Sequence, residues 1–463
     1  MVLPRLAFLV GAALAAAPVS QVRLALTTDV NDCSNGMAVQ FASTDSSPYD
    51  VTFYAEGDQD NTQTVQSTSE NYSFKSGNCS YTSPELHKAF LCDLAPSTRY
   101  TYTVGNKTHS FLTPMTPGCD DAPTVIGVVG DPGDTTHSGK TIKNLVKPVN
   151  GMDVQAIFIA GDYSYANGQA EYWDKWYNFH EATLAGIGQL GINGNHEVVS
   201  SKGHTWGDLT YAQCKGEDYR DYFKRVITPI TDDAKAAKQT YYSYDIGLVH
   251  LIFLDDYAGS AGSEVNTVGT PAWKAAREAQ LQFLKDDFIG LDRDATPWVI
   301  VIKHNPFYNT WKDHQCQCSK KVFEILDEDR ELCWNGNYTS GTPMSEPACG
   351  LQAKFEQVYV ENGVNVVMAG HVHGYERTAP IVNNKIDHAN GVVYITTGAG
   401  GNFEGPASNS TLAKLPEWSL KRNNQVYGSS KVIATRESLE LLWFSEDDGD
   451  KPWDSVTLTP RDN

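Results

Sequence analysis

Positive charge is scarce in this sequence, and long hydrophobic stretches are missing after its first residues. The 463 residues include 36 lysine and arginine residues against 56 aspartate and glutamate residues, a formal net charge of -20 at pH 7. Because nucleic acids and anionic membranes attract basic surfaces, neither is expected to be the main partner. No short repeat of the solenoid kind recurs. After the N-terminus no segment reaches the about 20 apolar residues of a membrane-spanning helix.

The composition is otherwise that of an ordinary globular protein, with 41% hydrophobic and 20% charged residues. A chain of this length has room for two or three domains. Its first residues, "MVLPRLAFLVGAALAAAPVSQVR", combine a basic Arg5, an apolar stretch over residues 6–17 and small residues at positions 15 and 17. These features predict a secretory signal peptide over residues 1–17 and a secreted protein. The alternative, a membrane anchor, requires a longer apolar run.

Cysteines and glycosylation sequons agree with secretion. Nine cysteines in an oxidising compartment predict several disulfides, and the odd number leaves one thiol unpaired in a monomer or joins two chains in a homo-oligomer. The late cluster of Cys316, Cys318, Cys333 and Cys349 lacks the C-x₂-C spacing of common zinc sites, so a disulfide-stapled loop is favoured over a zinc knot. N-linked glycans are predicted at five N-x-[ST] sequons, at Asn71, Asn78, Asn106, Asn337 and Asn409.

The spacing of apolar residues changes once along the chain. Over residues 22–116 short apolar and polar runs alternate, as in "GMAVQFAS" and "TRYTYTVGNKTHSFLT", which predicts an all-β sandwich domain. Proline and small polar residues then mark a linker over residues 117–124. Over residues 125–463 apolar runs such as "VQAIFIAG" alternate with helical patterns such as "PAWKAAREAQLQFLKDD", so an α/β domain that ends in further strands is predicted.

Five of the apolar runs in the second domain end in a polar residue that can bind a metal. These residues are Asp131 in "VVGDPGD", Asp162 in "IAGDYSYA", Asn195 in "INGNHE", His304 in "VIKHNPFY", and His371 with His373 in "MAGHVHGYER". Ligands of open α/β sheets collect beyond the carboxyl ends of the strands, so the six side chains are expected to converge. Each residue alone could be a turn former or a core residue. Their recurrence at five strand ends predicts a metal site.

Glycine directly precedes four of the predicted ligands, at positions 130, 161, 194 and 370. We expect these glycines to let the backbone turn sharply at the end of each strand. Carboxylate, imidazole and amide donors suit iron, zinc or manganese, and the donors are too many for one ion. Two ions sharing a carboxylate would clamp a phosphoryl group and lower the pKa of a bound water. The sequence therefore predicts hydrolysis of phosphate esters.

The ordered set "GDPG", "GDYSY", "GNHE", "VIKH" and "GHVHGYER" resembles the five-block signature of the purple acid phosphatases, within the metallophosphoesterase superfamily. The resemblance covers nearly the whole mature chain. "ELHKAFLCDLAPSTRYTYTVG" resembles the end of the fibronectin-III-like N-terminal domain of the high-molecular-weight type, and "GAGGNFEG" with "PEWS" resembles its C-terminal blocks. The implied fold is a fibronectin-III-like sandwich followed by an αββα catalytic sandwich.

The resemblance also implies roles for the ligands. It assigns Asp131, Tyr165 and His373 to a ferric ion, and Asn195, His304 and His371 to a divalent ion, with Asp162 bridging the two. Tyr165 would then be a phenolate whose charge transfer to iron colours the protein. Zinc, iron and manganese are all candidates for the divalent ion.

The implied reaction is in-line attack on phosphorus by hydroxide bound at the metals, while a nearby imidazolium helps protonate the leaving group. His196 is the first candidate for that imidazolium. Plant-like members of the family carry two adjacent histidines after the "VIKH" block, whereas this chain has Asp313 and His314. His314 keeps one donor or is a solvated loop residue. Asp313 could raise the pKa of His314 or repel phosphate.

Three further residues, Glu197, Glu376 and Arg377, are interpreted as supports that orient the ligands. His250, inside the apolar run "LVHLIF", is expected to be a core histidine rather than a ligand. Residues 311–350 resemble an insertion that either rims the active site or is a decorative loop.

The main hypothesis is a secreted acid phosphatase acting on small phosphorylated substrates. A phosphodiesterase or nucleotide pyrophosphatase using the same centre is the closest rival. A serine/threonine protein phosphatase shares "GNHE", but secretion and the motif around Tyr165 disfavour it. A surface adhesion protein with a vestigial metal site is the hypothesis from another class, which intact ligands disfavour.

Overall fold

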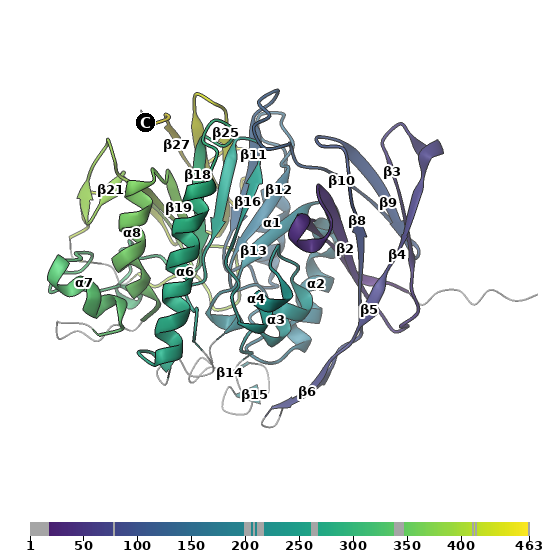
Figure 1. The fold of residues 1–463 in the computed structure, drawn as a ribbon, viewed down its shortest axis with the longest axis horizontal. Coiled ribbons are helices and arrows are strands. Elements are labelled where there is room, and N and C mark those ends of the chain that lie inside the picture. The colour runs from purple at the N-terminus through teal and green to yellow at the C-terminus, as the bar shows by residue number, and fades with distance from the viewer. Residues whose placement is uncertain are drawn as a thin grey trace, which may run out of the picture.

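The structure, a computed structural model, describes residues 18–76, 79–198, 205–206, 209–210, 217–260, 267–337, 347–409, 412 and 414–461. The predicted signal peptide, the sequon at Asn78 and Cys214 lie outside the described residues. Figure 1 shows the N-terminal strands at one end of the long axis and helices α6, α7 and α8 at the other, with stacked sheets between them.

The N-terminal region consists of short strands that form two facing layers. Its strands are β1 (Ser20–Thr27), β2 (Gly36–Ser43), β3 (Asp50–Ala55), β4 (Gln63–Gln66), β5 (Thr68–Glu70), β6 (Ser73–Ser76), β7 (Cys79–Thr82), β8 (Glu85–Leu91), β9 (Arg99–Val104) and β10 (Lys107–Leu112). One layer has the order β1-β2-β8-β5 and the other the order β10-β9-β3-β4. Alternate residues such as Phe41, Phe53 and Tyr102 fill the space between them. The predicted β-sandwich is confirmed.

Strand β1 joins this sandwich to the rest of the molecule. It pairs antiparallel with β2 on one side and parallel with β13 on the other, where Leu24 lies opposite Gly188. One layer of the sandwich therefore continues into a sheet of the catalytic domain, and the joint sheet has ten strands. The division at residues 117–124 stays a prediction.

The first catalytic sheet follows the order β27-β26-β25-β11-β12-β13. Its elements are β11 (Thr124–Val129), β12 (Ala156–Ala160), β13 (Gly188–Ile192), β25 (Gly428–Ala434), β26 (Leu439–Ser445) and β27 (Asp454–Leu458), with helices α1 (Thr136–Leu145) and α2 (Glu171–Leu184). Strands β11, β12 and β13 are parallel. Successive side chains of a strand point to opposite faces. Val125 and Val129 therefore pack toward Trp173 of α2, and Ile126 and Val128 face the second sheet.

The second catalytic sheet follows the order β16-β17-β18-β19-β23-β20-β24. Its strands are β16 (Tyr242–Ile246), β17 (Val249–Phe253), β18 (Trp298–Lys303), β19 (Val366–Ala369), β20 (Tyr375–Thr378), β23 (Val393–Thr397) and β24 (Ser419–Asn423). The helices around it are α3 (Arg220–Arg225), α4 (Asp232–Ala236), α6 (Pro271–Gly290), α7 (Asp327–Trp334) and α8 (Gln352–Glu361). Two small hairpins are β14 (Thr205–Trp206) with β15 (Leu209–Thr210), and β21 (Ile381–Val382) with β22 (Lys385–Ile386).

The two catalytic sheets pack face to face. Phe158 of β12 meets Phe253 of β17 with ring centroids 5.7 Å apart, within a core that draws on both sheets. On the opposite face of the second sheet, Ile252 and Val299 pack in one cluster with Leu281 of α6. Helices thus cover both outer faces, and the implied αββα arrangement is confirmed.

The late cysteines form two nested disulfides. Cys316 bonds to Cys349, and Cys318 bonds to Cys333 inside that loop. All four are buried among hydrophobic side chains, so the disulfide-stapled loop is confirmed and the zinc knot is wrong. A third disulfide, Cys33–Cys92, lies in the sandwich. Within the described residues Cys119 is a free thiol.

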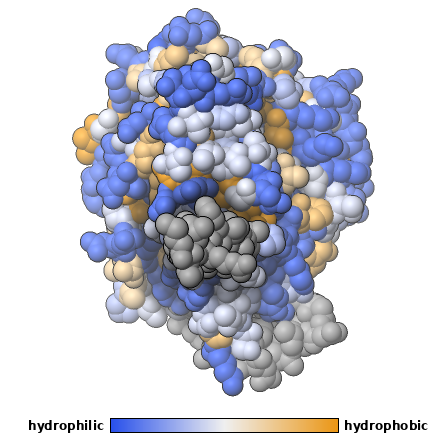
Figure 2. Space-filling view, turned by 90° about the vertical axis from the view of Figure 1, so that its right-hand side faces the viewer, coloured by the Kyte–Doolittle hydropathy of each residue, from blue (hydrophilic) through white to orange (hydrophobic). Residues whose placement is uncertain are grey.

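Hydrophilic residues cover most of the face that Figure 2 shows. In the described part of the chain, the helices all fall short of the length and apolarity that crossing a bilayer requires.

Candidate metal centre

The predicted ligands follow the C-terminal ends of five strands. Asp131, Asp162 and Asn195 come two or three residues after β11, β12 and β13. His304 directly follows β18, and His371 comes two residues after β19. These strands are parallel within their sheets, and the sheets are stacked, so their ends meet on one edge of the sandwich. The structure brings all the predicted ligand residues together.

One group of predicted ligands surrounds Tyr165. Its phenol oxygen lies 3.1 Å from Asp131 Oδ1 and 3.0 Å from His373 Nε2. His373 Nε2 is in turn 3.5 Å from Asp131 Oδ1. The three side chains come from loops after different strands, yet their donor atoms form one compact triangle.

A second group surrounds Asn195. Its amide oxygen lies 2.9 Å from His371 Nδ1 and 3.0 Å from His304 Nε2. Asp162 Oδ2 is 3.0 Å from the same His304 nitrogen. Donor atoms of Asp162, His304 and His371 all lie within 4.8 Å of one another. The groups are tied together by the backbone N–H of His371, which donates to Asp131 Oδ2 at 2.6 Å.

Four of the predicted ligands adopt backbone conformations that L residues rarely take. The φ angles are +59° at Asp131, +53° at Asp162, +56° at Tyr165 and +65° at His371. Non-glycine residues in this region are strained, and such strain clusters at functional sites. The sharp turns therefore occur at the ligands themselves.

The glycines before the ligands have a different role from the one expected. Of the four, only Gly161 has a positive φ, of 86°. The others permit close approach: a Cβ on Gly194 would lie 2.1 Å from Asp162 Oδ1, and one on Gly370 would lie 2.5 Å from Asp131 Oδ2. The sharp-turn explanation is thus wrong for three of them. Any side chain at Gly194 or Gly370 would occupy the space of a neighbouring ligand.

Burial and neighbouring groups at the centre shift the pKa values of its side chains. Burial opposes charge on both Asp162 and His304, but the imidazole holds the pKa of the carboxyl well below its usual range, and the carboxylate raises the pKa of His304 to about 10. Burial and the Asp131 carboxylate raise the pKa of Tyr165 well above 10.

His196 lies beside these groups. Its ring is 4.3 Å from the Tyr165 ring, centroid to centroid. Its Nδ1 donates to Asn167 Oδ1 at 2.6 Å, and Asn167 is held because its Nδ2 donates to the Tyr165 carbonyl. His196 Nε2 lies 3.7 Å from Asp162 Oδ2 and 3.8 Å from Glu404 Oε1.

His314 also lies near the centre. Its ring centroid is 5.0 Å from that of His371. The neighbouring Asp313 is exposed and accepts a hydrogen bond from Ser408 Oγ at 2.8 Å. The start of the 311–350 segment therefore reaches the edge of the site, while its four cysteines lie in a separate hydrophobic cluster.

Two of the three predicted supports, Glu197 and Glu376, bind loops that carry predicted site residues. Glu197 accepts from the backbone N–H groups of Asp162, Tyr163 and Gly194 at 2.8–3.0 Å, so it orders two ligand loops at once. Glu376 accepts from the backbone and hydroxyl of Thr310, in the loop that leads from His304 to His314.

Arg377 does not support the ligands in this way. Its guanidinium pairs with Asp454 of β27 at 2.6 Å, and Tyr375 donates to the same carboxylate. Side chains alternate across a strand, so Arg377 and Tyr375 share the face of β20 opposite to Glu376. His250, expected to be a core histidine, is buried, and its ring nitrogens lie 2.6 and 2.8 Å from the carboxylates of Asp245 and Asp287.

Several residues at the site escaped the sequence analysis. Asp256 accepts from the backbone N–H of His304 at 2.9 Å and pairs with Lys303 at 2.6 Å. It follows the apolar run "LVHLIFLDD", so the strand-end pattern was a usable signal. Phe403 and Glu404 lie in a loop without periodicity; the family resemblance covered their block "GAGGNFEG" but assigned the two residues no role.

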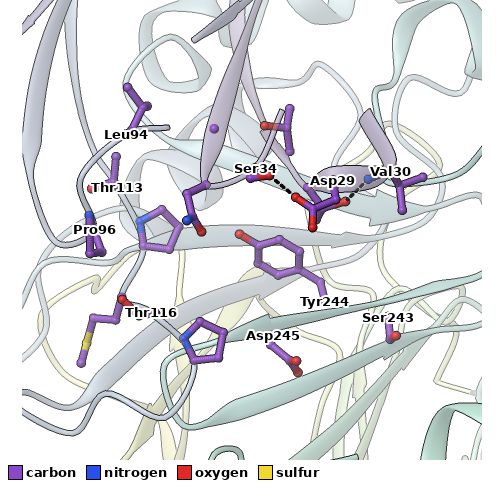
Figure 3. A pocket seen from close by; sticks show the side chains of 17 residues that line it. Asp29, Val30, Ser34, Leu94, Pro96, Thr113, Thr116, Ser243, Tyr244 and Asp245 are labelled. Carbon is purple, nitrogen blue, oxygen red and sulfur yellow. Dashed lines mark hydrogen bonds between the residues drawn. The ribbon is translucent and has the colours of Figure 1, made fainter. Parts of the chain in front are cut away.

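A separate cavity of about 550 Å³ lies between the N-terminal region and β16 (Figure 3). Its two acidic side chains, Asp29 and Asp245, already bind Ser34 and His250. Its lining includes no lysine, arginine or histidine. A phosphate needs positive charge, so this cavity is not the phosphate site.

Known families match three consecutive parts of the chain. Residues 19–117 match the family described as purple acid phosphatase, N-terminal domain. Residues 124–375 match the calcineurin-like phosphoesterases. Residues 391–455 match the family described as iron/zinc purple acid phosphatase-like protein C. The second match carries all the predicted metal ligands.

Individual relatives are distant. Purple acid phosphatase 23 of Arabidopsis thaliana is 28% identical over 71% of this chain and 65% of its own length. Fe(3+)-Zn(2+) purple acid phosphatase 12 of the same plant is 27% identical over 89% of this chain and 78% of its own length.

Among solved structures, the purple acid phosphatase PPD1 from yellow lupin (Lupinus luteus) seeds superposes with a TM-score of 0.69 over 96% of this chain and 75% of that chain. At 20% identity this likeness concerns the fold alone. The matched families span more than half of the chain, in the order N-terminal, catalytic and C-terminal domain. The chain belongs to the calcineurin-like phosphoesterases, as a purple acid phosphatase with an N-terminal domain, a metallophosphoesterase catalytic domain and a C-terminal domain.

Proposed function

We propose that this protein is a secreted acid phosphatase that hydrolyses phosphate monoesters at an Fe(III)–M(II) centre. The observation that carries the proposal is the convergence of seven side chains of types that can bind metals, from five strand ends, into two adjoining groups. Four of these residues hold strained backbone conformations. Strain retained at a cluster of donors supports a functional centre rather than a structural one.

The donor set fits two different ions. Asp131, Tyr165 and His373 offer two acidic oxygens and one imidazole, which suit Fe(III). Asn195, His304 and His371 offer an amide oxygen and two imidazoles, which suit zinc, iron or manganese in the divalent state. Asp162 adjoins the second group and would bridge the ions. The raised pKa of Tyr165 means that the protein alone keeps the phenol protonated, whereas a bound cation reverses that preference.

When bound, the two ions would hold the phosphate group and supply an activated water at acid pH. The protein's own part is to protonate the leaving oxygen, which we assign to His196. Its Nδ1–H is committed to Asn167, so Nε2 is the nitrogen directed toward Asp162 and Glu404. A proton held at Nε2 can pass to the oxygen that leaves phosphorus. His314, beside His371, is proposed as a second donor to phosphate.

Secretion and glycosylation are part of the proposal. The sequon residues Asn71, Asn106, Asn337 and Asn409 are exposed, which leaves room for N-linked glycans. Three disulfides in the described residues agree with an oxidising compartment. A smaller apparent mass after treatment with an N-glycosidase would support the glycans.

The first experiment compares a phosphate monoester and a diester as substrates at acid pH. We expect faster turnover of the monoester, and a loss of more than about 100-fold in the Asp162→Asn variant, because the shared carboxylate is removed. Faster turnover of the diester would instead favour the phosphodiesterase. If the wild-type protein were as inactive as the Asp162→Asn variant, the result would favour the alternative hypothesis of an adhesion protein with a vestigial metal site.

A second measurement, the visible absorption spectrum of the air-oxidised protein, tests the ferric assignment. A tyrosinate-to-iron band that disappears in Tyr165→Phe is expected. A metal-loaded, active and colourless protein would contradict the assignment of iron to Tyr165.

A further inference from the structure

Hydrogen bonds at both ends hold the turn formed by residues 401–405, "GNFEG", against predicted metal ligands. Before its tip, the backbone N–H and the side-chain amide of Asn402 both donate to the Asp131 carbonyl, at 3.3 and 3.1 Å. After its tip, the Gly405 carbonyl accepts from His373 Nδ1 at 2.9 Å. Thr135 also bonds the Gly401 carbonyl. The tip of the 401–405 turn is therefore fixed relative to the ligands Asp131 and His373.

A large aromatic side chain stands at this tip. Phe403 is 43% exposed, although its ring meets the Tyr165 ring edge-on, with centroids 5.6 Å apart and planes at 70°. Exposure of one phenylalanine is unremarkable by itself, since Phe179 is 44% exposed on α2. What distinguishes Phe403 is that a pinned turn holds its exposed ring beside the reaction centre.

Phe403 lies close to the histidine to which we assign the leaving-group proton. The rings of Phe403 and His196 both contact Tyr165. The residue after Phe403, Glu404, lies 3.8 Å from His196 Nε2, the atom to which we assign the leaving-group proton. A leaving group that takes this proton would therefore lie next to the 401–405 turn, which carries the exposed Phe403 ring.

We propose that Phe403 determines specificity by stacking against substrates whose leaving group carries an aromatic ring. This inference rests on the proposed function and narrows its substrate class. Hydrolysis breaks the bond between phosphorus and the ester oxygen, water supplies the new oxygen on phosphorus, and the His196 proton goes to the ester oxygen. The products are an aromatic alcohol or phenol and inorganic phosphate. Aromatic rings prefer offset-stacked or edge-to-face arrangements, with ring centroids about 4.5–7 Å apart.

The experiment uses three esters with similar alkoxide leaving groups, namely benzyl phosphate, cyclohexylmethyl phosphate and ethyl phosphate. We expect the wild-type protein to favour the benzyl ester. The Phe403→Ala variant should lower kcat/KM for benzyl phosphate roughly five- to tenfold, mainly through a higher KM, with a smaller loss for ethyl phosphate. Phe403→Leu should lose the preference for benzyl over cyclohexylmethyl, and Phe403→Trp should keep it.

Two controls separate stacking from a structural effect. Phe179→Ala removes an equally exposed ring elsewhere and should leave all three rates as in the wild type. Calorimetric titration with benzylphosphonate and ethylphosphonate measures binding without turnover, and Phe403→Ala should weaken only the first markedly. Equal losses for all esters, or an unchanged ratio, would overturn this inference alone. Hydrolysis of none of the esters by the wild-type protein would overturn the proposed function and this inference with it.

Discussion

The proposed metal centre and the junction between the N-terminal region and the catalytic domain are both rich in buried polar groups. The partners of these groups differ between the two regions. At the junction, the fully buried Arg225 pairs with Asp174 at 2.9 Å and donates to Tyr72 at 3.0 Å. Its carbonyl accepts from Arg23, whose guanidinium covers the Tyr177 ring at 3.7 Å. Positive groups at the junction therefore meet carboxylates, carbonyls or rings of the protein.

At the metal centre, by contrast, acceptors and imidazoles from five loops crowd together on strained backbone. Asn195 Oδ1 lies within 3.0 Å of two imidazole nitrogens, and burial together with the neighbouring Asp131 carboxylate raises the pKa of the Tyr165 phenol. This arrangement suits cations supplied from outside. The comparison implies that damage at the centre should remove activity, and damage at the junction should remove stability.

The largest effect is expected from Gly194→Ala. A Cβ there would lie 2.1 Å from Asp162 Oδ1, so the carboxylate has to move. Displacement of a catalytic group by about 1 Å can cost on the order of 100-fold in rate. We expect kcat/KM for a phosphate monoester to fall at least about 100-fold, together with loss of bound metal, measured by elemental analysis.

The matched control for this change is Gly290→Ala. Gly290 ends helix α6, and an added Cβ would meet nothing within 4 Å. Activity and metal content should therefore match the wild-type protein. If Gly194→Ala retained full metal content and activity, the close approach at Gly194 would not matter to the centre.

A smaller effect, and on stability, is expected from Arg225→Ala. The change leaves Asp174 without its cation and removes the hydrogen bond to Tyr72. Breaking a buried pair costs about 3–5 kcal/mol, and because Asp174 is 22% exposed we expect about 2 kcal/mol of unfolding free energy. Denaturant unfolding measures the change. Rates per folded molecule should stay near the wild-type value.

Arg99→Ala serves as the control at the surface. Arg99 pairs with Asp153 at 2.7 Å, but both side chains are more than 40% exposed, and exposed pairs contribute about 0–1 kcal/mol. A loss from Arg99→Ala equal to that from Arg225→Ala would contradict the importance of burial at the junction. If Arg225→Ala lowered activity but not stability, the expectation that the junction serves stability and the centre serves activity would be contradicted.

The sequence predicted the metal centre better than the junction for a physical reason. Apolar runs of five or six residues identify buried parallel strands, and parallel strands end on the same edge of a sheet. Asp131, Asp162 and His304 could thus be grouped without knowing how the strands are ordered. Tyr165 and the division of ligands between two ions needed the family resemblance.

The junction depends on information that local patterns do not carry. The run around Leu24 indicates a strand, but nothing near it indicates that this strand pairs with Gly188, far along the chain. The direction of Arg377 was missed because alternation on β20 is masked by burial on both faces. Phe403 and Glu404 belong to a turn whose position is fixed only by contacts with distant loops.

The smallest effect is expected at His250. This buried histidine differs from both regions because two carboxylates of the protein pair with its ring. Burial opposes its charge, but hydrogen bonds to Asp245 and Asp287 raise its pKa to about 9. Because the folded pKa exceeds the ordinary value of about 6.5, this stabilisation is fully present below that pH and is lost as pH rises through about 9. We expect His250→Asn to cost on the order of 1–2 kcal/mol at pH 5, since Asp245 is partly exposed.

Denaturant unfolding of both proteins between pH 5 and pH 10 measures the difference, which should shrink toward the alkaline end. His388→Asn, a change at an exposed histidine, should show no such pH dependence. A stability difference for His250→Asn that stayed constant with pH would mean that packing, rather than charge, holds His250. The buried histidine would then resemble the hydrophobic core around it, and the contrast between protein-satisfied charges and the metal centre would rest on Arg225 and Arg23 alone.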